Sequence, residues 1–312
     1  MKIFFYVLVI ILNLQIVHAQ YTEIINSKRP GFSESPYGVG TDVMQFESGL
    51  FYQSNASNNI LVSPSSMGGE LFFRYGKFKE KLEFNASVAY QSNEINNPFG
   101  DPIYHYGVSQ LTIGAKYLFY QKEYTDKTKE VRSWKKRMAF DKNRLIPSVG
   151  AYVGVHTNFL GKDFKEDGIS YKGAVLLQND FSDRLVVLTN LYADKITSLQ
   201  EHYSYIVTMT YAVTQDWSFF LENQGKFYDE FSPNYQFGTG VAYLVSPNLQ
   251  LDASVRSNLL EDYGNMYLST GFSWRLDRHQ DSFTLKNSPQ QNSIPKRRKG
   301  GFFSRIFGKK RN

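Results

Sequence analysis

Residues 202–214 read HYSYIVTMTYAVT, and the period of this stretch decides the fold. Every second position carries a large apolar side chain: Tyr203, Tyr205, Val207, Met209, Tyr211 and Val213. The positions between them are mostly Ser, Thr and Ala. Successive side chains of a β-strand point to opposite faces, so the stretch predicts a strand with one apolar face. The same alternation, roughly ten residues followed by a turn, recurs about twelve times between Val43 and Leu276.

The repeated alternation favours a closed barrel in a membrane over a soluble sandwich. Tyr and Trp often mark the ends of the apolar faces, as in the aromatic girdles of outer-membrane barrels. A sheet satisfies its backbone in lipid only when it closes on itself. The predicted fold class is all-β: an antiparallel transmembrane β-barrel of about 12 strands. An extended N-terminal segment and a disordered basic C-terminal tail are expected to flank it.

The alternation also sets the expected strand boundaries. We expect strands at residues 43–53, 68–76, 81–92, 107–120, 145–158, 170–181, 184–193, 202–214, 217–226, 234–245, 249–258 and 265–276. The barrel as a whole is expected to span residues 43–276.

Tight turns and longer polar loops alternate along the chain. Tight turns are predicted at 77–80, 182–183, 215–216 and 246–248, and longer loops at 54–67, 93–106, 159–169, 194–201, 227–233 and 259–264. Bacterial outer-membrane barrels have short periplasmic turns and longer extracellular loops. The six longer loops are therefore expected outside the cell, with both chain ends in the periplasm. Residues 121–144 break the rule as a long, basic periplasmic insertion, either a disordered or partly helical loop or a docking site for a periplasmic partner.

The first residues predict export. Lys2 precedes an almost unbroken apolar run from Ile3 to Val17, and Ala19 ends a cleavage-like sequence. Residues 1–19 are therefore predicted to be a secretory signal peptide, and the localisation is the cell outer membrane of a Gram-negative bacterium. A mean hydropathy of −0.39 is too low for a helical membrane protein. A barrel can have this value, because every second residue of its strands faces the lumen.

The formal net charge of +6 is concentrated in two places. Residues 282–312 hold nine basic residues and no acid, and residues 122–144 hold nine basic residues against four acids. The strands and other loops are therefore net acidic, which argues against nucleic acid as a partner. The tail, residues 277–312, is interpreted either as an interfacial anchor on anionic outer-membrane lipid or as a disordered solubilising tail.

A distinctive segment, residues 20–42, lies between the signal peptide and the first strand. Its motif residues are Arg29, Pro30, Gly31, Glu34 and Pro36. Prolines favour extended backbone before them, so the segment could run along the periplasmic rim or enter the lumen. Arg29 is expected to seek a carboxylate, and Glu47 on the first strand points inward by parity.

This segment and the strand MQFESG that follows resemble the outer-membrane transporter family labelled for a meta-pathway of phenol degradation. Members open with Arg-Pro-Gly or Arg-Pro-Asp, then Glu-Ser-Pro, a glycine turn and a Gln-hydrophobe-Glu-x-Gly strand. The match covers about 25 residues, with Trp134 and Pro147 in weaker echoes. The resemblance implies a barrel that passes small molecules, apolar or aromatic ones among them.

Parity of the strands predicts which charged side chains line the lumen. The predicted set is Glu47, Glu70, Arg74, Glu83, Lys116, His156, Lys172, Asp180, Glu222, Asp252, Arg256 and Arg275. Without the histidine these are six acids and five bases, so no selectivity for cations or anions is indicated. Twelve strands lie between filled small barrels and open porins. A narrow polar conduit and a plug held by salt bridges therefore both stay open.

Other function classes find less support. A lipid hydrolase needs a nucleophile, a base and an orienting group, and His156 in the sequence His-Thr-Asn is the nearest approach. No Gly-x-Ser-x-Gly elbow, His-Glu-x-x-His motif or phosphate loop occurs. The absence of cysteine removes thiolate metal sites. We expect no catalysis, metal or cofactor, and an adhesin-like or structural barrel remains the alternative to passive small-molecule transport.

Overall fold

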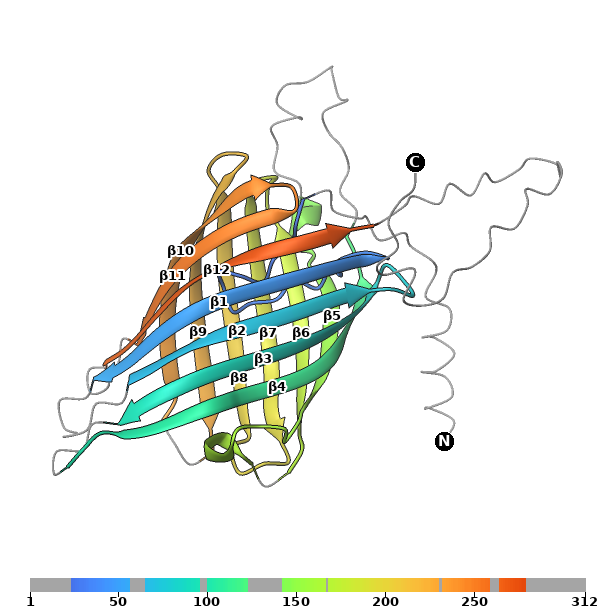
Figure 1. Cartoon of the computed structure of the whole chain (residues 1–312). Coiled ribbons are helices and arrows are strands. Elements are labelled where there is room, and N and C mark those ends of the chain that lie inside the picture. The colour runs from blue at the N-terminus through green and yellow to red at the C-terminus, as the bar shows by residue number, and fades with distance from the viewer. Residues whose placement is uncertain are drawn as a thin grey trace, which may run out of the picture. The chain divides into compact units, whose positions relative to one another are not determined.

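Twelve antiparallel strands form one closed barrel in the computed structural model of the chain. The structure describes residues 24–56, 65–95, 100–122, 142–166, 168–229, 232–258 and 264–278. Each strand pairs with its neighbours in sequence, and β1 (Val43–Ala56) closes the barrel against β12 (Gly264–Asp277) (Figure 1). The predicted fold class, a barrel of twelve strands, is confirmed.

The other strands follow in chain order. They are β2 (Ser65–Gly76), β3 (Leu82–Ile95), β4 (Ile103–Tyr120), β5 (Ser148–His156), β6 (Ser170–Asp180), β7 (Leu185–Ile196), β8 (His202–Ala212), β9 (Trp217–Tyr228), β10 (Asn234–Ser246) and β11 (Leu249–Asn258). Two short 3-10 helices, η1 (Lys142–Leu145) and η2 (Lys162–Phe164), lie in the connections around β5.

The strand boundaries differ from the expected ones mainly around β4 and β5. β4 begins four residues earlier than predicted, because Ile103 still pairs with Ile95 of β3. β5 begins at Ser148 rather than 145, because residues before it form η1 instead of continuing the strand.

The two ends of the barrel differ in their connections. Short connections join β2 to β3, β6 to β7, β8 to β9 and β10 to β11, and they share one end with the start of β1. We call this the tight-turn end and the opposite one the long-loop end. The described residues do not include the predicted signal peptide 1–19, residues 123–141 of the predicted insertion, or the tail beyond residue 278.

The outer face of the barrel is apolar on every strand. Large apolar side chains stand exposed there, such as Leu50 at 69% and Val153 at 65% of full exposure. At the closing seam, Phe46 of β1 stacks on Trp274 of β12 with ring centroids 5.8 Å apart. An apolar exterior on a closed sheet is what a hydrocarbon environment requires. Among the described residues, no helix has the length and apolar character needed to span a membrane.

Candidate functional site: a folded segment inside the barrel

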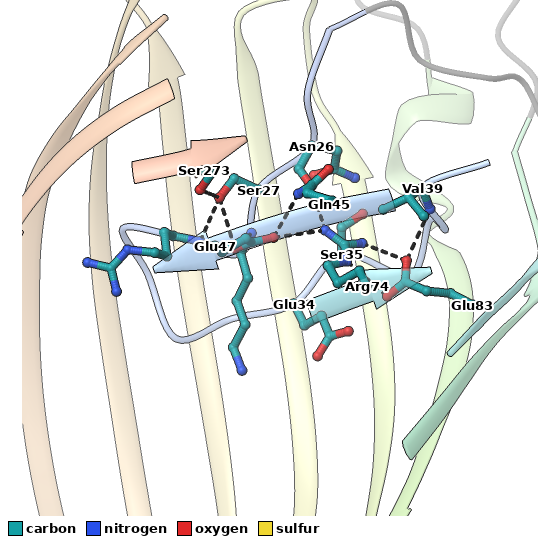
Figure 2. A network of polar contacts seen from close by, with 12 residues as sticks. Asn26, Ser27, Glu34, Ser35, Val39, Gln45, Glu47, Arg74, Glu83 and Ser273 are labelled. Carbon is teal, nitrogen blue, oxygen red and sulfur yellow. Dashed lines mark hydrogen bonds and ion pairs between the residues drawn. The ribbon is translucent and has the colours of Figure 1, made fainter. Parts of the chain in front are cut away.

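Residues 24–42, here called the inner segment, fold into the lumen from the tight-turn end. The Ile25 N–H donates to the carbonyl of Pro247 between β10 and β11, at 2.9 Å. The Asp42 N–H donates to the carbonyl of Gly76 at the end of β2, also at 2.9 Å. Between these two points the segment crosses the interior of the barrel (Figures 1 and 2). Of the two placements that the sequence left open, the structure shows the lumen.

The backbone of the inner segment is irregular, so its polar groups need partners other than a β-ladder. Three inward glutamates accept its N–H groups. The Glu47 carboxylate accepts from the N–H groups of Lys28 and Arg29, at 3.0 and 3.2 Å. The Glu83 carboxylate accepts from the N–H of Val39 at 3.0 Å. These bonds place the segment against β1 and β3.

The third glutamate, Glu222 of β9, holds the segment on the opposite wall. Its Oε2 accepts from the N–H groups of Phe32 and Ser33, at 2.9 and 3.3 Å. A Cβ atom at Gly31 would lie 2.9 Å from the same oxygen. The motif glycine therefore permits a backbone approach that a side chain would obstruct.

Basic residues of the wall bind these glutamates and also donate to the segment's carbonyls. Arg74 of β2 donates to Glu83 at 2.8 and 2.9 Å, to Glu47 at 3.3 Å, and to the Asn26 carbonyl at 2.6 Å (Figure 2). Lys116 of β4 donates to the Ser35 carbonyl at 3.0 Å.

Arg256 of β11 does the same for the opposite wall. It donates to Glu222 at 3.0 Å and to the carbonyl of Pro30 at 3.3 Å. The mixed charges of the lumen thus have a common explanation. The acids accept hydrogen bonds from backbone N–H groups of the inner segment, and the bases donate to its carbonyls and form ion pairs with the acids.

Asn190 of β7 binds both polar groups of one backbone residue. Its side-chain oxygen accepts from the Glu34 N–H at 2.7 Å, and its amide donates to the Glu34 carbonyl at 2.8 Å. Asn190 is fully buried. The Glu34 carboxylate lies 3.1 Å from the ammonium of Lys116. Parity could have placed Asn190 in the lumen, but nothing in the sequence singles out its partner.

The expected side-chain pairing of Arg29 with Glu47 is wrong. The Arg29 guanidinium donates to Asp252 of β11 at 3.0 Å and binds Glu70 of β2, while Glu47 pairs with Arg74. Arg29 lies directly over Gly49, where a Cβ atom would collide with the guanidinium. The side chain therefore reaches across the β1–β12 seam to carboxylates on strands on either side of it.

Apolar side chains also line part of the lumen, which strand parity alone did not indicate. A buried cluster comprises Tyr152, Ala174, Leu176, Tyr192 and Ile206, on β5 to β8. Phe32 of the inner segment packs against it, and the Arg256 guanidinium lies 3.3 Å above the Phe32 ring. Phe32 thus joins the two walls of the barrel near its middle. The last motif residue, Pro36, packs against Gly150 of β5.

The remaining predicted lumen residues lie outside these contacts. Asp180 accepts from Gln178 at 2.8 Å, and Arg275 donates to Asn248 at 2.8 Å near the tight-turn end. His156 and Lys172 lie toward the long-loop end, where both bind Asp194 of β7 at 2.6 and 2.7 Å.

His156 also contacts Thr112 at 2.7 Å, so that a hydroxyl, an imidazole and a carboxylate form a chain. This order resembles a hydrolase triad. Thr112 is only 2% exposed, however, and Asp194 is shared with Lys172. A substrate has no access to the hydroxyl, so the geometry indicates a structural network. Asp194 was missing from the predicted set.

Among the cavities formed by the described residues, two lie at opposite ends of the barrel. One, of about 850 Å³, is bounded by the segment itself from Ile25 to Tyr37 and by the tight-turn halves of β6 to β10. The other, of about 750 Å³, opens at the long-loop end between residues 195–202 and the end of β9. Within the described ranges, no group of three or more His, Asp or Glu side chains is placed to hold a metal ion.

The charges around the inner segment shift the pKa values of its own side chains. Burial by itself would raise the pKa of Glu34, but the ammonium of Lys116, followed by Lys28 and Arg74, holds that pKa below its usual value. Burial would lower the pKa of Arg29, but Asp252 and Glu70 raise it above its usual value. Both groups therefore stay charged inside the lumen at neutral pH.

A family model described as "Putative MetA-pathway of phenol degradation" matches residues 27–276. No curated protein matches the chain significantly. An outer membrane channel from Pseudomonas putida F1 is similar at 12% identity and a TM-score of 0.54, over 80% of this chain and 100% of that one. This likeness shows a shared fold.

Two further solved structures are similar at lower TM-scores. The KdgM porin has 10% identity and a TM-score of 0.45, over 72% of this chain and 98% of that one. The CymD monoaromatic hydrocarbon channel has 11% identity and a TM-score of 0.40, over 77% of this chain and 90% of that one.

Proposed function

The chain belongs to this phenol-degradation family, whose model spans both the inner segment and the barrel, and on that premise we propose that it is a channel of the outer membrane. Small molecules pass through it passively, and residues 24–42 act as an internal plug that shifts when a solute passes. The tight-turn end faces the periplasm, as in bacterial barrels with short periplasmic turns. Small aromatic compounds are the solutes that the family's description favours.

The observation that supports the plug most directly is how the inner segment is attached. Its two ends are fixed to the backbone of the wall, Ile25 to Pro247 and Asp42 to Gly76. Between these ends it is held by side chains such as those of Glu222 and Asn190. The segment can therefore move without opening any strand ladder, and the barrel wall stays closed in lipid.

The cavities support passage on both sides of the plug. The 850 Å³ and 750 Å³ spaces are each large enough for a small organic molecule, a size typical of ligand pockets. Movement of the segment would connect them into one path.

Permeation in proteoliposomes tests this function. The purified, folded barrel should admit small neutral solutes such as arabinose and phenol faster than empty liposomes do. Asn190→Leu removes both bonds to the Glu34 backbone, so this variant should admit them faster still. Asp216→Asn changes an exposed side chain of the β8–β9 turn that does not line the 850 Å³ cavity, and this matched control should behave like the natural chain. A folded barrel that admits no solute would contradict the proposal.

A plugged structural barrel is the second candidate, favoured by the buried ion pairs between the wall and the segment, such as Arg74 with Glu83. It predicts no permeation in the natural chain or in Asn190→Leu. The hydrolase alternative is tested by a lipase assay with His156→Ala. We propose that activity is absent in both forms, because Thr112 is buried. A periplasmic partner at residues 121–144 stays a prediction, since most of that insertion lies outside the described residues.

A further inference from the structure

We propose that the cavity at the long-loop end is a binding subsite for a small organic monocarboxylate, with Lys226 as its principal ligand. The proposal deepens the channel function and rests on it, since the subsite would select solutes before they meet the inner segment. The cavity measures about 750 Å³ and is lined by Lys195, Ser198, Leu199, Gln200, Glu201, His202, Lys226, Tyr228 and Asp229.

Lys226 differs from the other cations of the lumen wall. Arg256, Lys172 and Lys195 each bind a carboxylate, at 3.0, 2.7 and 2.6 Å. The ammonium of Lys226 has no hydrogen-bond or ion-pair partner among the described residues, although the side chain is half-buried and lines the cavity. A charged group with restricted access to water is costly to leave unpaired. An anion in the cavity would relieve that cost.

Several charged groups of the lumen act on Lys226. Lys172, Lys195 and Arg256 repel its ammonium, and Asp194 attracts it. Both oxygens of Asp194 are already bound, one by His156 and one by Lys172.

A second donor without a partner lies deeper in the lumen. Nη1 of the buried Arg256 has no hydrogen-bond partner among the described residues. Lys226 and Arg256 therefore offer donors in succession between the long-loop end and the inner segment.

The rest of the lining specifies the kind of anion. His202 and Tyr228 present adjacent rings, with centroids 4.9 Å apart, and both line the cavity. Flat rings favour contact with a planar organic group. Glu201 and Asp229 stand on the same lining, and their charges disfavour a dianion such as phosphate. A single carboxylate on a ring-sized body fits these features.

Titration of the full-length protein in detergent tests the subsite, with benzoate as the probe and benzamide as its neutral counterpart. Benzoate should bind saturably and benzamide far more weakly. Lys226→Gln should weaken benzoate binding by about tenfold, the scale of one lost charge-assisted hydrogen bond. Lys226→Arg should retain most of the affinity. Lys165→Gln removes an exposed lysine of the long-loop end that does not line the cavity, and it should change nothing.

Three results would overturn the subsite: no saturable binding of benzoate, unchanged binding in Lys226→Gln, or an equal loss in Lys165→Gln. A change in gel mobility between unheated and heated samples verifies that each variant is a folded barrel. Permeation of arabinose separates this proposal from the channel function. If arabinose passes and benzoate does not bind, the subsite fails alone. If benzoate binds and no solute passes, the channel fails and the subsite stands.

Discussion

The two halves of the lumen use the same residue types for different occupants. In the tight-turn half, Glu47, Glu83 and Glu222 bind backbone N–H groups of the inner segment, and arginines bind the glutamates. In the long-loop half, Lys226 faces a cavity and finds no partner among the described residues. The chain is its own ligand in one half, and we propose that a solute occupies the other half.

This difference explains how a mixed-charge lumen is tolerated. A buried charge is stable only when it is paired or hydrated. The inner segment supplies the pairing where the lumen is filled, and in the long-loop half Asp194 pairs with His156 and Lys172. A count of acids and bases over the whole lumen therefore does not distinguish the tight-turn half from the long-loop half.

The largest expected effect comes from breaking a pair in the filled half. Glu222→Gln leaves Arg256 buried without its carboxylate, so the free energy of unfolding should fall by about 3–5 kcal/mol. Asp194→Asn, in the more open half and 15% exposed at the side chain, should cost clearly less. Urea unfolding in detergent, followed by circular dichroism, measures both. Equal losses would erase the distinction between the halves.

A smaller effect tests the position of Arg29. Gly49→Ala places a methyl group where the guanidinium lies, and the resulting overpacking should cost about 1–3 kcal/mol. In the Arg29→Ala background the same change should cost little, because the obstacle is gone. Gly173→Ala is the matched control, since nothing lies within 4 Å of its Cβ position. A cost of Gly49→Ala that persists without Arg29 would place the side chain elsewhere.

The smallest effect concerns pH. The pKa of Glu34 is lowered in the folded protein, so its charge stabilises the docked segment fully above the usual glutamate pKa of about 4.3. That contribution is lost as the pH falls through the lowered value. The thermal midpoint of the natural chain should therefore change little between neutral and mildly acidic pH, then drop more than that of Glu34→Gln. Parallel curves for the two proteins at every pH would contradict this role.

The sequence predicts those features of the fold that follow from a two-residue period. Alternation predicts the twelve strands, and parity names Glu47, Arg74 and Glu222 as inward. Parity says nothing about which side chains meet across the lumen. Arg29 and Asp252 are 223 positions apart, and only closure of the barrel brings them together. For the same reason the Arg29–Glu47 pairing was wrong. Asp194 was overlooked because the predicted strand ended at residue 193, whereas β7 continues to Ile196.

The inward apolar cluster shows a second limit of the pattern. Tyr152 and Ile206 occupy lumen positions that the rule of polar residues inside assigns to hydrophilic side chains. They are apolar because Phe32 of the inner segment packs there, and a segment without regular structure leaves no period in the sequence. Occupancy of the lumen by part of the chain was therefore beyond what alternation could indicate.

The claim that residues 24–42 plug the lumen is tested most directly by locking them in place. Ser27 of the inner segment and Ser273 of β12 have their hydroxyl oxygens 2.6 Å apart (Figure 2). The chain contains no cysteine, so the double variant Ser27→Cys/Ser273→Cys can form only one intramolecular disulfide. A plug that must move for solutes to pass predicts that oxidation stops the passage of arabinose in proteoliposomes and that a reductant restores it. Equal passage in the oxidised and reduced forms would contradict it.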